Sequence, residues 1–163
     1  MEYIGLFRKL FEAQVQYLIC GGLAVNIYGI PRMTADIDLL ISFDEANIQK
    51  FEQVLSELAF ESVVPIQLNT LLDQGKRQQV IEEKNLIAYS YYNKHSNYMN
   101  IDILIDVPLS FQNMWTSRET RSIEDFKINI VSLQDLIDLK RYANRTQDKQ
   151  DILMLNKLQN ISN

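Results

Sequence analysis

Residues 20–41 have the sequence CGGLAVNIYGIPRMTADIDLLI, which combines a glycine pair, two closely spaced carboxylates and a run of large aliphatic residues. Asp36 and Asp38 are two positions apart, so on an extended strand both side chains point to the same face of a sheet. Two like charges this close repel each other unless a cation or hydrogen-bond donors compensate them. Carboxylate oxygens are hard ligands that suit Mg²⁺ or Mn²⁺, so Asp36 and Asp38 are candidate metal ligands.

The glycine pair lies between two apolar segments. Tyr17–Cys20 predicts a short strand and Leu23–Tyr28 predicts a short helix, with Gly21 and Gly22 between them. Glycine lets a backbone approach a ligand closely, and the first N–H groups of a helix favour an anion. A phosphate-binding turn beside a metal-binding strand suits a nucleoside triphosphate with its metal ion, although the chain contains neither the P-loop pattern nor the dinucleotide-binding glycine pattern.

The segment from Gly21 to Asp38 resembles the signature of the nucleotidyltransferase superfamily that shares the palm fold of DNA polymerase beta. The resemblance rests on the Gly-Gly turn, the short helix and the motif Pro-Arg-x-Thr-x-Asp-Ile-Asp, in that order. It implies a third catalytic carboxylate on a later strand, for which Asp102 in MNIDILID (residues 99–106) is the candidate. Asp106 shares the same face of that strand. Asp102 is preferred because it lies mid-strand among isoleucines, whereas Asp106 precedes Val-Pro at the expected strand end.

The same resemblance implies residues that bind the nucleotide. Gly21 and Gly22 would let backbone amides hold the outer phosphates. Arg32 is a candidate to contact a phosphate, and Thr34 to contact a phosphate or the ribose. Both side chains have a structural alternative. An arginine after proline at a strand entry is as often a packing residue, and threonine is a common strand residue.

A second segment, residues 131–152, resembles the C-terminal signature of small bacterial nucleotidyltransferases of the abortive-infection and toxin–antitoxin type. The recurring positions of that signature are occupied by Lys140, Ala143, Arg145, Asp148 and Asp151. Gln147 stands where the family usually has lysine. The resemblance makes Lys140 a candidate to neutralise a triphosphate. The alternative is an ion-pair set of Lys140, Arg145 and Asp148 between two helices.

The order of apolar patterns predicts an α/β (α+β) fold. The resemblance implies that this fold is a nucleotidyltransferase palm with a mixed β-sheet, flanking helices and a C-terminal helical pair. We expect a single domain over residues 1–163, with the palm core at about 16–131 and the C-terminal helices at about 132–160.

Several local expectations accompany this fold. An amphipathic helix is expected after Ser42, which with Glu45 forms a capping-box signature. Residues 65–83 predict short helical pieces, in which Lys76 and Arg77 either reach a nucleotide or an acceptor or are simply solvated. Farther along, residues 86–105 predict a hairpin with its turn at 93–97, residues 126–131 predict a strand, and Ser132 predicts the cap of the next helix.

Composition and charge weaken several function classes. The net charge of -5 argues against a general nucleic-acid binder. The single cysteine, Cys20, excludes an internal disulfide, and with one histidine, His95, the chain has no zinc pattern and is a poor candidate for a Ser-His-Asp triad. No apolar run is as long as a membrane span and the N-terminus has no signal-peptide pattern, so we expect a cytoplasmic protein with no membrane partner.

Residues and resemblance together predict a nucleotidyltransferase dependent on Mg²⁺ or Mn²⁺, in which Asp36, Asp38 and Asp102 bind the metal and carry catalysis. It would move a nucleoside monophosphate from a nucleoside triphosphate to an acceptor hydroxyl, on tRNA or a partner protein in a toxin–antitoxin context. Modification of an antibiotic is the alternative enzyme function. A non-catalytic nucleotide-binding or antitoxin module is the alternative from another class, against which the three carboxylates argue. The sequence leaves the nucleotide, the acceptor and the oligomeric state open.

Overall fold

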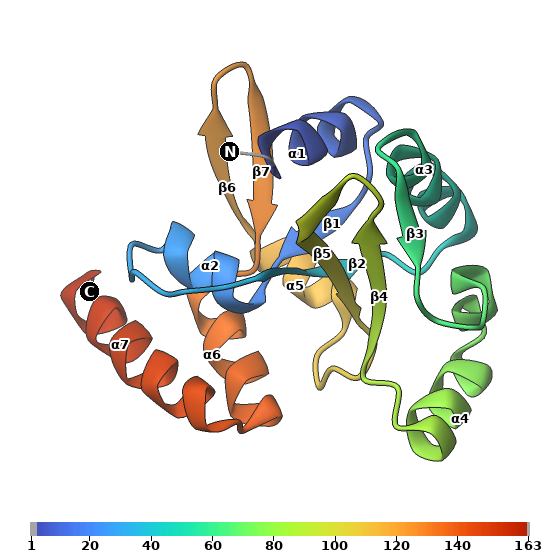
Figure 1. Cartoon of the computed structure of the whole chain (residues 1–163). Coiled ribbons are helices and arrows are strands. Elements are labelled where there is room, and N and C mark those ends of the chain that lie inside the picture. The colour runs from blue at the N-terminus through green and yellow to red at the C-terminus, as the bar shows by residue number, and fades with distance from the viewer. Residues whose placement is uncertain (1–2, 163) are drawn as a thin grey trace.

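The computed structural model describes residues 3–162, apart from the side chains of residues 97–99 and 162. Its centre is a seven-stranded sheet with the strand order β3-β4-β5-β2-β1-β7-β6 (Figure 1). The strands are β1 (Tyr17–Ile19), β2 (Asp36–Ile41), β3 (Phe60–Ser62), β4 (Ala88–Asn93), β5 (Ser96–Leu104), β6 (Glu119–Ile123) and β7 (Phe126–Ile130). Two pairs, β2 with β5 and β1 with β7, are parallel, and the remaining neighbours are antiparallel. The predicted mixed sheet is therefore confirmed.

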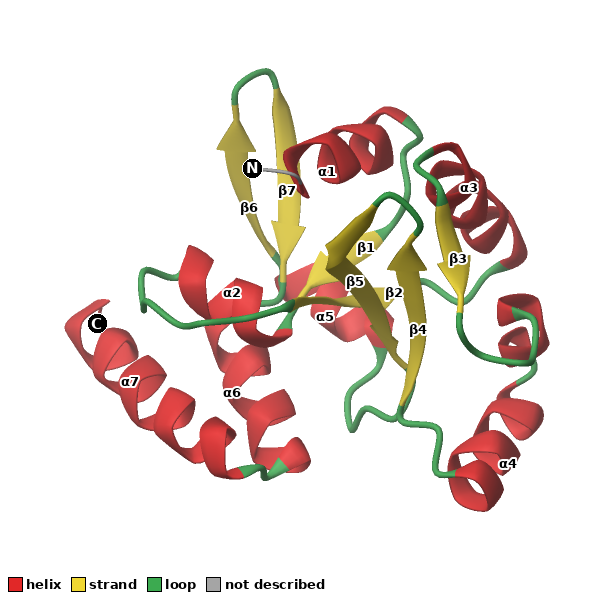
Figure 2. Cartoon of the chain, in the orientation of Figure 1, coloured by secondary structure: helices red, strands yellow, loops and turns green. Residues whose placement is uncertain are grey.

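Helices flank this sheet (Figure 2). They are α1 (Tyr3–Glu12), α2 (Gly21–Ile27), α3 (Glu45–Glu57), the 3₁₀ helix η1 (Leu68–Leu72), α4 (Gln74–Lys84), α5 (Phe111–Ser117), α6 (Leu133–Ala143) and α7 (Thr146–Ser162). Only Asn144 and Arg145 separate α6 from α7, and Asn144 ends α6 in the left-handed conformation. The predicted C-terminal helical pair is thus present. No helix within residues 3–162 is both long and apolar enough to cross a membrane.

The core explains the orientation of the carboxylates on β2. Ile37, Leu39 and Ile41 are buried on one face of the strand. Since successive side chains of a strand alternate, Asp36 and Asp38 lie on the other face, where both are only partly buried. Burial of the aliphatic residues against the core thus fixes which way the two carboxylates point.

Three local predictions were wrong or incomplete. The N-cap of α3 is Asp44, whose side chain accepts a hydrogen bond of 2.9 Å from the Asn47 backbone N–H, whereas Ser42 only donates its hydroxyl to Asp44. The helix α2 begins at Gly21 and not at Leu23, so the glycine pair lies in its first turn and does not precede it. Strands β3 and β6 were not predicted, since both are short edge strands with mostly exposed or half-buried side chains.

The other predicted elements are present in the structure. Residues 65–83 contain η1 and most of α4, and the hairpin of β4 and β5 has a shorter turn than predicted. Ser132 is the N-cap of α6, where its side chain accepts a hydrogen bond from the Asp135 backbone N–H.

Candidate active site

The parallel pairing of β2 and β5 brings the predicted carboxylates together. Asp38 is directly opposite Asp102 in the register, and Asp36 is opposite Asn100. Asp106 lies beyond the end of β5 and accepts a hydrogen bond of 2.8 Å from the Tyr142 hydroxyl of α6. Of the two candidates for a third carboxylate, Asp102 is therefore the one that lies beside Asp38.

The junction of β1 and α2 is built against the same carboxylate. The Cys20 backbone N–H donates a 3.0 Å hydrogen bond to the Asp38 carbonyl, which joins β1 to β2 just before the glycine pair. Gly21 has φ of +61°, and a Cβ placed on it would lie 1.8 Å from Oδ2 of Asp38. The site thus requires glycine at position 21 both for its backbone conformation and for the space that the carboxylate occupies.

Burial and the charges of two neighbouring carboxylates both raise the pKa of Asp38. Burial is the main cause that raises the pKa of the Asp38 carboxyl, and the charges of Asp102 and Asp36 raise it further. A hydrogen bond from the Gly22 backbone N–H and the charge of Arg145 lower it, but the net pKa lies above the ordinary value. The protein's own groups therefore compensate the negative charge of Asp38 only in part.

These carboxylates fit a divalent cation by their chemistry. Asp36, Asp38 and Asp102 offer only hard oxygen donors on adjacent strands, and a cation would relieve the repulsion that acts on Asp38. Within the described part of the chain, no three acidic, histidine or cysteine side chains already form a ready-made metal cluster. Oδ1 of Asp36 accepts a 3.1 Å hydrogen bond from the Asn100 side chain.

Arg32 and Thr34 lie over the second glycine of the pair. A Cβ on Gly22 would be 2.9 Å from the Arg32 guanidinium and 2.7 Å from the Thr34 hydroxyl oxygen. Thr34 donates this hydroxyl to the carbonyl of Asp36 at 3.1 Å, at the entry to β2. The backbone N–H of Arg32 donates to the Asn26 side chain at 2.7 Å, which anchors the loop to α2.

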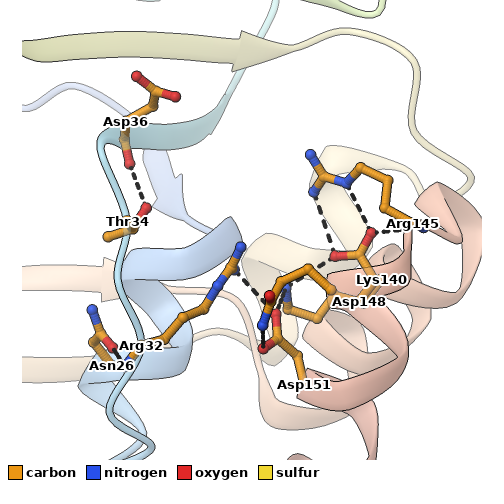
Figure 3. Close-up of polar contacts among 9 residues, drawn as sticks. Asn26, Arg32, Thr34, Asp36, Lys140, Arg145, Asp148 and Asp151 are labelled. Carbon is orange, nitrogen blue, oxygen red and sulfur yellow. Dashed lines mark hydrogen bonds and ion pairs between the residues drawn. The ribbon is translucent and has the colours of Figure 1, made fainter.

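The guanidinium of Arg32 joins an ion-pair network with the C-terminal helices (Figure 3). It lies 3.0 Å from Oδ2 of Asp151, which is also 2.7 Å from Nζ of Lys140. Lys140 lies in addition 3.3 Å from Oδ1 of Asp148, and the side chains of Lys140 and Asp148 are 3% and 0% exposed. The structure thus places Lys140 in the interhelical ion-pair set, and its role toward a triphosphate stays a prediction.

Arg145 links this network to Asp38. Its Nε donates to Oδ2 of Asp148 at 2.9 Å, while 68% of its side chain is exposed. Burial acts to raise the pKa of Asp148, but the side-chain and backbone hydrogen bonds from Arg145 outweigh it and the pKa is lowered. The hydrogen bond with Asp148 is the main cause that raises the pKa of Arg145, and the charges of Asp148 and Asp38 raise it further.

Two residues near the candidate site were not predicted as part of it. Arg145 had a signal, since it matches an arginine of the C-terminal signature, but spacing alone does not show that its charge acts on Asp38. Asn100 had none, because its contact with Asp36 depends on the register of two strands that are far apart in the sequence.

The same fold occurs in solved structures of nucleotidyltransferases. The lincosamide antibiotic adenylyltransferase LnuA with bound lincomycin has a TM-score of 0.60 and 17% identity, over 96% of each chain. ANT(2")-Ia in complex with adenylyl-2"-tobramycin has a TM-score of 0.57 and 12% identity, over 98% of this chain and 94% of that one. An antigenic nucleotidyltransferase-like protein from Paracoccidioides brasiliensis has a TM-score of 0.56 and 22% identity, over 94% and 72%. At these identities the likeness establishes the fold.

Sequence comparison identifies the family. No curated protein matches the chain. The family model described as "Nucleotidyl transferase AbiEii toxin, Type IV TA system" matches residues 6–154, which include the glycine pair, the carboxylates and most of the C-terminal helices. The chain therefore belongs to the AbiEii nucleotidyltransferase family of type IV toxin–antitoxin toxins.

Proposed function

We propose that this nucleotidyltransferase moves a nucleoside monophosphate from a nucleoside triphosphate to an acceptor hydroxyl, with Mg²⁺ or Mn²⁺ bound at Asp36, Asp38 and Asp102. In this reaction the acceptor oxygen bonds to the α-phosphorus, the bond from that phosphorus to the bridging oxygen breaks, and pyrophosphate leaves. The hydroxyl proton passes to a carboxylate of the site or to water.

The observation that supports this proposal best is the pairing of Asp38 with Asp102 on parallel strands, next to a glycine that leaves room for one of the two carboxylates. Like charges at adjacent positions on a sheet destabilise the fold unless a ligand uses them. The raised pKa of Asp38 is typical of groups that bind a metal or transfer a proton.

Each residue of the site would have a role that follows from its position. Asp36 and Asp38 would hold the metal that neutralises the triphosphate, and the metal would supply charge stabilisation for the leaving pyrophosphate. Asp102 would orient the acceptor hydroxyl and accept its proton. Gly21 and Gly22 would allow the phosphates to approach the backbone, and Arg32 and Thr34, directly above Gly22, would contact them.

Lys140 would act on the nucleotide through Arg32 or directly. Both cations share the carboxylate of Asp151, so a phosphate that attracts Arg32 would change the charge balance around Lys140. Because Lys140 is 3% exposed, direct contact with a phosphate would require the C-terminal helices to shift.

The family description names a toxin of a type IV toxin–antitoxin system, which implies an antitoxin partner, and names no acceptor. The first candidate acceptors are tRNA and a partner protein. Antibiotic modification is the second candidate. It draws support from the two similar structures that contain lincomycin and adenylyl-2"-tobramycin, although these resemble the chain in fold only. A non-catalytic module is disfavoured because all three carboxylates are present on the expected strands.

The proposal is tested by incubating the protein with Mg²⁺ and each nucleoside triphosphate, labelled at the α- or the γ-phosphate. The acceptors are tRNA, total cell protein and representative antibiotics, each in a separate reaction. We expect label in one acceptor class from the α-labelled nucleotide only, together with release of pyrophosphate. Transfer of γ-label would indicate a kinase, and metal-dependent nucleotide binding without transfer to any acceptor would favour the binding module.

A further inference from the structure

A cavity of about 400 Å³ opens at the carboxyl ends of β2 and β5, next to the candidate site. Its walls include Leu40 and Leu104, each two residues after a predicted catalytic carboxylate on the same strand face. At about 3.3 Å per residue, these side chains lie roughly 7 Å along the strands from Asp38 and Asp102. The crevice outside the carboxyl ends of adjacent parallel strands is the usual ligand position in α/β proteins.

Arg77 of α4 lines this cavity and has no acidic partner. Among the ion pairs and side-chain hydrogen bonds within the described residues, none involves the Arg77 guanidinium, and its Nε is buried without a hydrogen-bond partner. The guanidinium instead lies over the ring of Phe43, 4.3 Å from its centre. Burial lowers the pKa of Arg77, as expected for a cation that has lost water and gained no counter-charge.

The one acidic residue in the cavity wall does not compensate Arg77. Asp106 accepts a hydrogen bond of 2.8 Å from Tyr142 of α6, which ties the C-terminal helical pair to the cavity. The rest of the lining is neutral. It consists of glutamines and Ser110 beside aliphatic and aromatic side chains that include Phe111 and Met114. The cavity thus combines one partly desolvated cation with mostly apolar walls.

We propose that this cavity binds the acceptor, and that the acceptor is a small molecule with an apolar body, a hydroxyl group and a phosphate or carboxylate that Arg77 holds. The planar guanidinium, stacked on Phe43, offers its remaining N–H groups to two oxygens of such an anion. A volume of about 400 Å³ suits a small ligand. The net charge of -5 is unfavourable for a long polyanion.

The assignment of the ligand as acceptor rests on the proposed function, but the binding site does not. Binding is therefore measured without nucleotide, by following the Arg77 side-chain Nε–H signal in NMR titrations with phenyl phosphate, benzoate, benzyl alcohol and benzylamine. We expect the two anions to bind at least tenfold more tightly than the neutral and cationic analogues. Equal binding of all four probes, or binding that leaves the Arg77 signal unmoved, would overturn the proposal.

Variants separate the cavity from general surface charge. Arg77→Gln removes the cation, Arg77→Lys keeps the charge but loses the planar fork, and Lys76→Gln removes the neighbouring exposed cation that does not line the cavity. Affinity for phenyl phosphate should fall at least tenfold in Arg77→Gln, by an intermediate factor in Arg77→Lys, and by less than twofold in Lys76→Gln. Equal losses of affinity in Arg77→Gln and Lys76→Gln would mean that binding depends on long-range electrostatics, which would contradict the proposed binding site.

The transfer assay tests the acceptor role. Arg77→Gln should raise the KM for the acceptor at least tenfold and leave nucleotide affinity unchanged. If anions bind at Arg77 but transfer proceeds equally in the variant, the cavity is not the acceptor site. If tRNA is the acceptor and its use depends on Arg77 while small anions fail to bind, the small-molecule assignment is wrong. If neither wild type nor any variant transfers a nucleotide, the proposed function is wrong, and the titrations still show whether the cavity binds anions at Arg77.

Discussion

Asp38 of β2 and Asp102 of β5 are register partners on parallel strands, and the charge of Asp102 adds to burial in raising the pKa of Asp38. Two like charges directly opposite each other on neighbouring strands destabilise a fold. The arrangement is explained if the pair serves a ligand that carries positive charge, which is why a metal-dependent transfer reaction is the preferred function.

The raised pKa of Asp38 predicts a pH dependence of stability. Because the folded protein holds this proton more tightly than the unfolded chain, wild type loses stability as pH rises from about 4 through the pKa of folded Asp38. Asp38→Asn removes this loss, so its stability relative to wild type should increase between pH 4 and pH 7. Urea unfolding in metal-free buffer with a chelator measures the difference.

Asp125→Asn is the control of opposite sign. The hydrogen bond from Arg8 lowers the pKa of the Asp125 carboxyl, so this group contributes stability that is present above its unfolded pKa and lost as pH falls. A difference between wild type and Asp38→Asn that does not change with pH would contradict the electrostatic description of the site.

Metal binding should stabilise the folded protein. Saturating Mg²⁺ or Mn²⁺ should raise the Tm of wild type. At a metal concentration of one hundred times Kd, binding adds about 2.7 kcal/mol to the free energy of unfolding. Asp38→Asn and Asp102→Asn should lose most of this shift. Asp138→Asn, an aspartate of α6 that pairs with Arg141 at 2.9 Å, is the control and should keep it. An equal shift in all four proteins would mean that the ion binds elsewhere.

Gly21 is predicted to be irreplaceable, because Asp38 occupies the space of a side chain and because the backbone has a positive φ. Gly21→Ala would place a methyl group 1.8 Å from Oδ2 of Asp38 at a φ of +61°, so it should destabilise the fold by about 2 kcal/mol or more and displace the carboxylate. Nucleotidyl transfer should fall with it.

Gly29→Ala is the matched control, since Gly29 has a φ of +95° but nothing lies within 4 Å of the position that a Cβ would take there. It should cost about 1 kcal/mol through the backbone alone and keep the activity. Thermal unfolding and the transfer assay measure both effects. If both variants lose activity equally, the close approach of Asp38 to Gly21 is not what the site requires.

The ion-pair network between the C-terminal helices is predicted to be a stability element. Lys140→Met would leave Asp148 and Asp151 buried with one cation fewer, at a cost of about 3–5 kcal/mol. Lys9→Met removes an exposed pair with Glu57 at 3.4 Å and should cost less than about 1 kcal/mol. Equal changes in the free energy of unfolding, measured with urea, would contradict the structural role of Lys140.

Local patterns predicted the parts of this protein that depend on neighbouring residues. The alternation of Asp36 and Asp38 with buried aliphatic residues follows from the strand period. Asp102 was predicted because the family resemblance implies a third carboxylate on a later strand, where an aspartate stands between isoleucines. The ion pair of Arg32 with Asp151 could not be derived from spacing, since it depends on how α7 returns to the loop before β2. Edge strand β6 could not be predicted, because it has no apolar pattern of its own and is a strand through its pairing with β7.

The most direct test of the proposed catalytic site is transfer of α-labelled nucleoside monophosphate by wild type, Asp38→Asn and Asp102→Asn, with folding of each variant checked by its Tm. We expect wild type to label an acceptor and each variant to reduce the rate at least 1000-fold, on the order expected when a carboxylate of a metal site is lost, while both remain folded. Transfer at the wild-type rate by either folded variant would contradict the central claim that these two carboxylates perform the reaction.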